Sequence, residues 1–292
     1  MSEKMADDFL MSPMVDYCFK ELLAYPTVRK GFLAAILNRD PSEIGSTELL
    51  PTILEKETEE GKYGILDVRI RMKDGSQIDL EMQVVPFAFW ERRILFYLSR
   101  MYTEQIKAGE NYGEMKRCIH VSILNFIHFP EDQICFREIA LCDLQTKKKY
   151  TDLLEIYVLE LKKLPPEQLK EPMIIQWMRF LSAQKKEDFE KMAEKDGYIG
   201  EAYGVLKKLS ADEQKRLEYE ARQKAILDYN SQVIGYTEKG IQIGEERGKK
   251  KGEERLGRLC EALMDAGRME DLKKAVSNEE YRKELYQEFD IL

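Results

Sequence analysis

Residues 65–84 have the sequence ILDVRIRMKDGSQIDLEMQV, in which two runs of alternating polarity flank a short polar segment. Alternation of apolar and polar residues is typical of a β-strand with one buried face, and a glycine in the intervening segment favours a tight turn. The stretch therefore predicts an antiparallel hairpin with strands over 65–72 and 77–84.

The length of the hairpin loop decides which residues face each other. A two-residue loop, Asp74-Gly75, would set Val68 against Glu81 and would pair every apolar residue with a polar one. A three-residue loop with Gly75 in the left-handed conformation shifts the register by one residue, so that apolar residues oppose apolar residues. Because register follows the buried face, we predict this second arrangement, in which Asp67 lies opposite Glu81.

The two opposed carboxylates, Asp67 and Glu81, have two interpretations. Directly opposed Cβ atoms lie about 4.5–5.5 Å apart, and like charges at this distance are destabilising unless a cation neutralises them. Mg²⁺ is commonly held by one or two carboxylates together with several waters, and Gln83 projects from the same strand face. The alternative is a solvated polar face, in which Arg69 and Asp79 form a cross-strand ion pair.

Outside the hairpin, the hydrophobic pattern predicts a mixed α/β core followed by helices. Apolar residues recur at helical spacing near the N-terminus and again after the hairpin. The nearly continuous apolar run over 118–127 is typical of a central strand that is buried on both faces. After Pro165 the pattern is helical. The predicted elements are helices over about 14–37 (interrupted at Pro26) and 87–109, strands over 118–127, 134–141 and 153–161, and a loop over 38–62.

The C-terminal region has a different composition. Four glycines recur every four residues over 240–252, within a highly charged stretch. Each glycine costs a helix about 1 kcal/mol relative to alanine, so we expect a marginal helix or a flexible linker here. The last fifty residues are the candidate route to a homo-oligomer. We divide the chain into a core over 1–165, a helical extension over 166–235, and a charged Gly-repeat segment with C-terminal helices over 236–292.

The composition excludes several classes of protein. The chain has 292 residues, 34 % of them charged, and a net charge of −8 at pH 7, which argues against a basic coat on nucleic acid but not against an enzyme that touches DNA locally. No stretch approaches the roughly 18 apolar residues of a membrane helix, so no membrane contact is expected. Five cysteines without a CxxC pair indicate free thiols in a reducing cytoplasm, and two histidines are too few for a His-rich metal site.

Several motifs, in order along the chain, resemble one known family. Asp67, a loop and the motif EMQ over 81–83 resemble the active-site strand pair of PD-(D/E)XK nucleases, in the variant with Gln in place of the motif lysine. The motif DYCFK over 16–20 is similar to the D-x-x-F-K element of the Rpn family of recombination-promoting nucleases, also known as putative transposases. Residues 96–112, 150–164 and the glycine repeat also resemble this family.

The resemblance implies a PD-(D/E)XK nuclease-like α/β core, with a mixed central sheet flanked by helices and an α-helical C-terminal extension. It implies a metal-dependent endonuclease that hydrolyses phosphodiester bonds of DNA in recombination or mobile-element biology. Asp67 and Glu81 would hold Mg²⁺, with Mn²⁺ or Ca²⁺ as alternatives, and Gln83 would replace the lysine that positions the water. A neutral amide brings no positive charge. The alternative is therefore a catalytically inactive nuclease fold that binds DNA or protein.

Four accessory residues follow from the same resemblance. Asp16 is either a third acidic ligand or a first-turn aspartate favoured by the helix dipole. Lys20, four residues later, either pairs with Asp16 or contacts phosphate. Arg92 and Arg93, after the hairpin, are the nearest candidates in sequence to supply the positive charge that Gln83 lacks.

Two further signals are interpreted as structural. His120 alternates with Cys118 and Ser122 on one strand face, but a nucleophilic arrangement would need partners that the sequence does not identify, so we expect satisfied core residues. The aromatic and basic residues over 87–102 either stack bases and bind phosphate or form a core-facing stripe with arginines outside. For the aromatic residues we favour packing.

Overall fold

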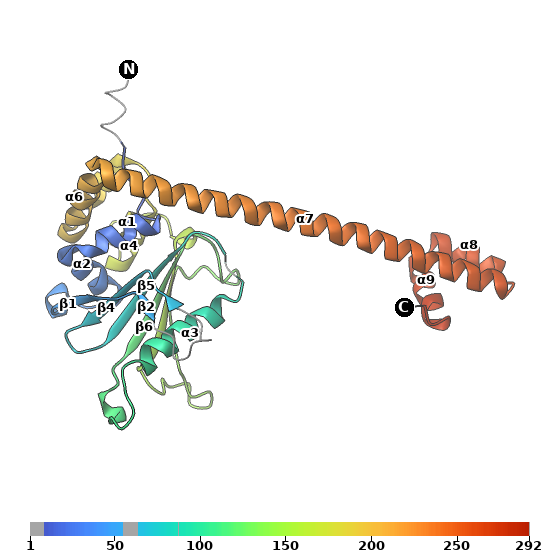
Figure 1. Ribbon diagram of the computed structural model, residues 1–292, viewed down its shortest axis with the longest axis horizontal. Helices are drawn as coiled ribbons and strands as arrows, with labels where there is room; N and C mark the ends of the chain where they lie inside the picture. Colours follow the sequence, from blue (N-terminus) through green and yellow to red (C-terminus); the bar gives the residue numbers. More distant parts are fainter. Residues whose placement is uncertain (1–8, 55–63, 87, 292) are drawn as a thin grey trace, which may run out of the picture. The chain divides into compact units, whose positions relative to one another are not determined.

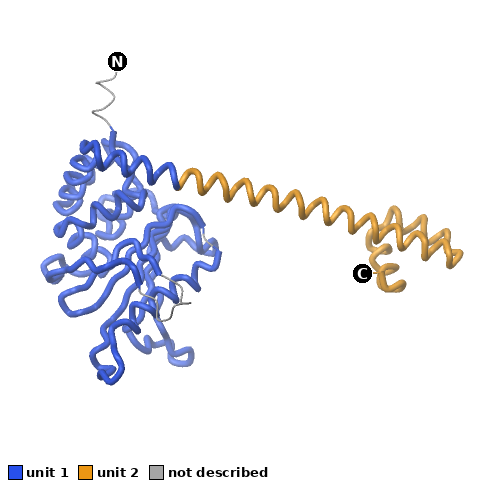
Figure 2. The backbone as a smooth tube through the Cα atoms, viewed as in Figure 1, with its two compact units in different colours: residues 1–225 blue, residues 226–292 orange. Residues whose placement is uncertain are grey.

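The computed structural model describes residues 9–54, 64–86 and 88–291 (Figure 1). The chain forms two compact units, residues 1–225 and 226–292 (Figure 2). Helix α7 (Glu213–Asp265) belongs to both units and continues through residue 236. The three-part division at 165 and 236 stays a prediction.

The first unit is built on a mixed sheet, which confirms the predicted α/β class. In the part of the chain that the structure describes, this sheet has six strands in the order β1-β4-β5-β6-β8-β7. The three central strands β5, β6 and β8 are parallel, and the remaining pairs are antiparallel. The strands are β1 (Thr47–Leu50), β4 (Val68–Met72), β5 (Gln77–Gln83), β6 (Cys118–Leu124), β7 (Phe136–Ala140) and β8 (Leu154–Glu160).

The hairpin of β4 and β5 has the predicted register. Val68 pairs with Leu80, so apolar residues oppose one another. The N–H of Met72 donates to the carbonyl of Ser76 at 2.8 Å, which closes a three-residue loop. Gly75 has φ +88°, the left-handed conformation that this loop requires and that glycine adopts without steric cost.

The polar face of this hairpin is buried, so the expectation of a solvated face is wrong. Arg69, Gln77, Asp79 and Glu81 are each at most 8 % exposed. Helix α3 (Trp90–Thr103) lies on this side of the sheet, whereas α1, α2, α4 and α6 group on the other side (Figure 1). Arg69 donates to Gln77 and to Glu104, at 3.0 and 3.2 Å, in place of the expected ion pair with Asp79.

The prediction of a loop over 38–62 is wrong at residues 47–50 and 53–54, which form short strands. β1 forms an edge strand there, and a separate short pair consists of β2 (Ile53–Leu54) and β3 (Gly64–Ile65). β1 has only four residues, and its two middle side chains are exposed, so no alternation marks it in the sequence. The rest of the predicted loop falls in residues 55–63, outside the described residues.

Helices in the first unit follow the sequence pattern closely. Pro26 begins a second helix, as predicted, because proline fits the first turn but not a helix interior. β6 is buried along its whole length, as its apolar run predicted. Besides α3 and the first part of α7, the helices described in this unit are α1 (Asp16–Ala24), α2 (Pro26–Ile36), α4 (Met173–Ser182), α5 (Lys186–Ala193) and α6 (Gly197–Ala211), with short 3₁₀ turns at Pro41–Glu43, Tyr112–Glu114 and Leu161–Lys163.

The second unit consists of the later part of α7 with α8 (Met269–Ser277) and α9 (Glu279–Glu288). The glycine repeat lies within α7 and is helical, the first of the two expected states. Among the residues that the structure describes, no helix is both long and apolar enough to cross a membrane. The small core of this unit contains Leu259, Leu263, Ala275, Leu285 and Ile291.

Candidate active site

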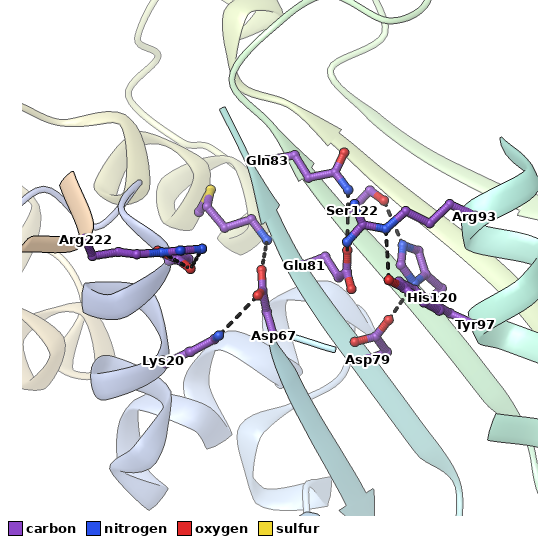
Figure 3. Close-up of polar contacts among 12 residues, drawn as sticks. Lys20, Asp67, Asp79, Glu81, Gln83, Arg93, Tyr97, His120, Ser122 and Arg222 are labelled. Carbon is purple, nitrogen blue, oxygen red and sulfur yellow. Dashed lines mark hydrogen bonds and ion pairs between the residues drawn. The ribbon is translucent and has the colours of Figure 1, made fainter. Parts of the chain in front are cut away.

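Glu81 lies in β5, and Asp67 lies one residue before β4, the other strand of the hairpin (Figure 3). The ladder between β4 and β5 ends at the pair Val68 and Leu80, and Asp67 directly precedes β4. Oδ2 of Asp67 accepts a hydrogen bond from the backbone N–H of Met82 at 3.2 Å. The carboxylate of Asp67 therefore reaches the segment of β5 that carries Glu81.

Glu81 is 2 % exposed, and its two carboxylate oxygens have different surroundings. Oε2 accepts hydrogen bonds from Arg93 Nη2 and from Gln83 Nε2, both at 3.3 Å. Oε1 is buried and has no hydrogen-bond partner among the described residues. Burial, followed by the charges of Asp79 and Asp67, raises the pKa of Glu81 to about 8, although Arg93 opposes this shift. A cation beside Oε1 would favour the charged form.

A buried line of polar side chains crosses from β5 to β6 beside Glu81. Asp79 and His120 are register partners, and both are completely buried. His120 Nδ1 lies 2.7 Å from Asp79 Oδ2, and its Nε2 lies 2.8 Å from Ser122 Oγ (Figure 3). Burial lowers the pKa of His120 to about 4 and raises that of Asp79 well above its usual range. His120 is therefore a satisfied buried residue, as expected.

Sequence reasoning did not connect this line to the carboxylates. The signal was present, because polar residues alternate on β5 over 77–83 and on β6 over 118–122. The parallel pairing of the two strands, which sets Glu81 beside Ser122, brings the two polar faces together.

The acceptor atoms around Glu81 suit a cation that prefers oxygen ligands. Within the described ranges, Asp79 Oδ1, Glu81 Oε1 and Gln83 Oε1 are buried without a hydrogen-bond partner. Such atoms are destabilising when they stay unpaired. No group of three or more His, Cys, Asp and Glu side chains in these ranges is placed to hold a metal ion. The ligands of a bound cation would therefore be the carboxylates of Asp67 and Glu81 together with water molecules, a ligand set that is common for Mg²⁺.

Asp16 and Lys20 lie one turn apart on α1 but have different partners. Lys20 Nζ is 3.2 Å from Asp67 Oδ1, so Lys20 pairs with Asp67 and not with Asp16. Arg222, in the first part of α7, donates from Nε to both oxygens of Asp16 at 2.8 Å, and its Nη2 is 2.6 Å from Oδ2. No sequence signal links two residues that lie 206 positions apart. The role of Asp16 as a third acidic ligand stays a prediction.

The two arginines at the start of α3 separate in the structure. Arg93 reaches Glu81, and its Nε donates to the hydroxyl of Tyr97 at 3.1 Å. Arg92 is exposed, and its guanidinium lies 5.2 Å from the ring centroid of Phe89. Of the two candidates, Arg93 is therefore the one placed at the carboxylates.

Comparison with protein families identifies a match over most of the chain. The model of a family described as PD-(D/E)XK nuclease family transposase matches residues 13–235. Comparisons with curated proteins and with solved structures gave no match. The matched span covers most of the chain and includes α1, the hairpin and the start of α3. The chain therefore belongs to the PD-(D/E)XK nuclease family transposases, the family that its motifs resemble.

Proposed function

We propose that this protein is a Mg²⁺-dependent endonuclease that hydrolyses phosphodiester bonds of DNA in the cytoplasm, in recombination or in the movement of mobile elements. One observation carries the proposal: Glu81 is buried with an unpartnered Oε1, on the strand that the Asp67 carboxylate reaches. A metal ion would supply the missing partner of Glu81 Oε1, because a buried oxygen that stays unpaired is destabilising.

Asp67 and Glu81 are the residues that would hold the ion. When bound, a divalent cation in such a site activates a water and offsets charge on the phosphate. Mn²⁺ and Ca²⁺ also accept carboxylate and water ligands, so they are the alternatives to Mg²⁺.

The remaining residues of the site supply orientation and positive charge. Gln83 donates to Glu81 and so fixes the direction of that carboxylate, but its amide is neutral. Arg93 and Lys20 each pair with one of the two carboxylates, Glu81 and Asp67 respectively. These two cations would offset the charge that develops on the attacked phosphate, in place of the lysine that the motif lacks.

Nicking of supercoiled plasmid in Mg²⁺ tests the proposal. The native protein is expected to cut, whereas Asp67→Asn and Glu81→Gln, which keep the shape and remove the charge, are expected to lose activity. Glu48→Gln is the matched control, because Glu48 forms an exposed ion pair with Arg71 in the same sheet. Equal cutting by all four proteins would refute the assignment of the two carboxylates.

The second candidate is a catalytically inactive member of the family that binds DNA or protein. Two observations favour it: Gln83 replaces a charged lysine, and both carboxylates already have cationic partners. Thermal unfolding in Mg²⁺ and Mn²⁺ discriminates between the candidates. An intact site stabilises the fold by about 1.4 kcal/mol at ten times the dissociation constant. An inactive site without metal affinity shows no such shift.

A further inference from the structure

The aromatic residues at the start of α3 divide into a buried and an exposed one. Trp90 is 3 % exposed, and its ring centroid lies 4.2 Å from that of His128 and 6.3 Å from that of Phe129. Phe89, one residue earlier, is 66 % exposed. The packing expected for the aromatic residues of this stretch therefore holds for Trp90, but it does not explain Phe89.

The backbone of Phe89 is also unusual. Its φ is +64°, in the left-handed region that bulky side chains rarely adopt. Glycine or asparagine would fit this conformation with less strain. Because most of the ring faces solvent, burial does not compensate for the strain. A strained residue whose side chain contributes little to the core is a candidate for a functional contact.

Phe89 is connected to the candidate active site through one turn of helix. Its carbonyl accepts the backbone N–H of Arg93 at 3.1 Å, and the guanidinium of Arg93 reaches Glu81 at 3.3 Å. The Arg92 guanidinium lies 5.2 Å from the Phe89 ring centroid. An exposed ring with a cation beside it is thus held one turn from Arg93, which contacts Glu81.

We propose that Phe89, with Arg92, is a stacking platform for an unpaired nucleobase of the DNA strand held at the site. This inference rests on the proposed binding of DNA there. Every base has a π-face that stacks on an aromatic ring, and a neighbouring arginine adds attraction to base and phosphate. An exposed ring that is followed within three residues by the charged side chains of Glu91 and Arg92 is not a broad apolar patch of the kind that binds a protein partner.

Stacking is measured with a single-stranded oligonucleotide that carries 2-aminopurine, whose fluorescence is quenched when the base stacks on a ring. The titration is done in EDTA, so that cleavage does not remove the probe. The native protein and Phe89→Tyr are expected to quench, whereas Phe89→Gly and Phe89→Asn are not. Leu95→Ala is the matched control, because it removes another exposed apolar side chain from α3.

Affinity gives the second readout. Phe89→Gly is expected to weaken binding by roughly 5- to 150-fold, which corresponds to the about 1–3 kcal/mol that stacking of one base contributes. The native protein should bind an abasic oligonucleotide more weakly than the normal oligonucleotide, by a similar factor. Phe89→Gly should bind the abasic and the normal oligonucleotide equally well. The melting temperature of Phe89→Gly should not fall, because glycine relieves the left-handed strain.

Two outcomes overturn the inference: the native protein does not quench, or Phe89→Gly quenches and binds as well as the native protein. Its failure differs from failure of the proposed function. Plasmid nicking that depends on Asp67 and Glu81, without quenching that depends on Phe89, refutes only the platform. Quenching that depends on Phe89 in a protein that does not nick refutes only the nuclease.

Discussion

Strand β5 and helix α7 both depart from the usual rule that apolar side chains are buried and charged side chains are exposed. β5 buries charged side chains, with Asp79 at 0 % and Glu81 at 2 % exposed. The part of α7 in the second unit exposes large apolar side chains, with Leu227 and Ile234 at 59 % and Ile241 at 57 %. These three residues recur every seven positions, the spacing of a coiled-coil seam.

The two regions offer different kinds of contact. The buried carboxylates of β5, with their unpartnered oxygens, suit a small cationic ligand. The exposed apolar stripe of α7 suits a complementary apolar surface. The predicted homo-oligomer through the C-terminal helices would supply that surface, and it stays a prediction. The following experiments test the two regions separately.

The largest expected effect on stability comes from breaking the buried polar line. His120→Leu removes the hydrogen-bonded partner of Asp79 and leaves that carboxyl group buried and unpaired. Because both groups are neutral near pH 7, the cost is that of a buried polar group left without its hydrogen-bond partner, typically about 1–3 kcal/mol. Urea unfolding measures the change. The control is Arg71→Leu, which breaks the exposed ion pair of Arg71 with Glu48 and should cost less than about 1 kcal/mol. Equal losses of unfolding free energy in the two variants would contradict the importance of burial.

The next effect is a dependence of stability on pH. The pKa of Glu81 is raised to about 8 in the folded protein, so the folded state holds a proton that the unfolded state has released. Without metal, this group therefore lowers stability as the pH rises from about 4.5 to about 8. Glu81→Gln should lose less stability than the native protein over this range.

Melting temperatures of both proteins, measured in EDTA across this pH range, check the prediction. His120 acts in the opposite direction, because its lowered pKa makes stability rise with pH between about 4 and 6.5. Because the charge of Glu81 also acts on His120, the difference between the two proteins reports on Glu81 together with its effect on His120. Parallel pH profiles for the two proteins would contradict the raised pKa.

The exposed stripe of α7 is tested by the double variant Ile234→Glu with Ile241→Glu. If the stripe joins copies of the chain, the two charges should lower the molar mass in solution to that of a monomer, as measured by light scattering after gel filtration. Gln232→Glu is the control, because it adds a charge at an originally polar position of the same helix. A native protein that is already a monomer would refute self-association.

The smallest effect is expected in the glycine repeat. An added Cβ at Gly244 or Gly248 meets no atom within 4 Å among the described residues. Gly244→Ala should therefore stabilise α7 by up to about 1 kcal/mol, because alanine has the higher helix propensity. Thermal unfolding followed by circular dichroism at a helical wavelength measures this change. A loss of stability would show that another helix backbone packs closely against these glycines.

The sequence predicted the hairpin well because its determinants are local. The alternation of residues and the position of Gly75 in the loop are enough to set Val68 against Leu80. The helix break at Pro26 has an equally local cause.

The candidate site was predicted only in part, because its remaining contacts join distant segments. The bond between Asp79 and His120 depends on the parallel pairing of β5 with β6, which α3 connects. The contact of Asp16 with Arg222 joins two residues that lie 206 positions apart in the sequence. The burial of the hairpin's polar face follows from the position of α3, which no local pattern specifies.

The tie between α1 and the start of α7 has a consequence during protein synthesis. Asp16 and Arg222 are 206 positions apart, and Tyr17 and Lys215 make similar long-range contacts with Glu218 and Glu21. At about 5–20 residues per second, a ribosome needs about 10–40 s to make the intervening chain. Throughout that time α1, which carries Lys20, lacks these partners on the nascent chain. The arrangement around Asp67 is therefore completed late, when nearly the whole first unit has been translated.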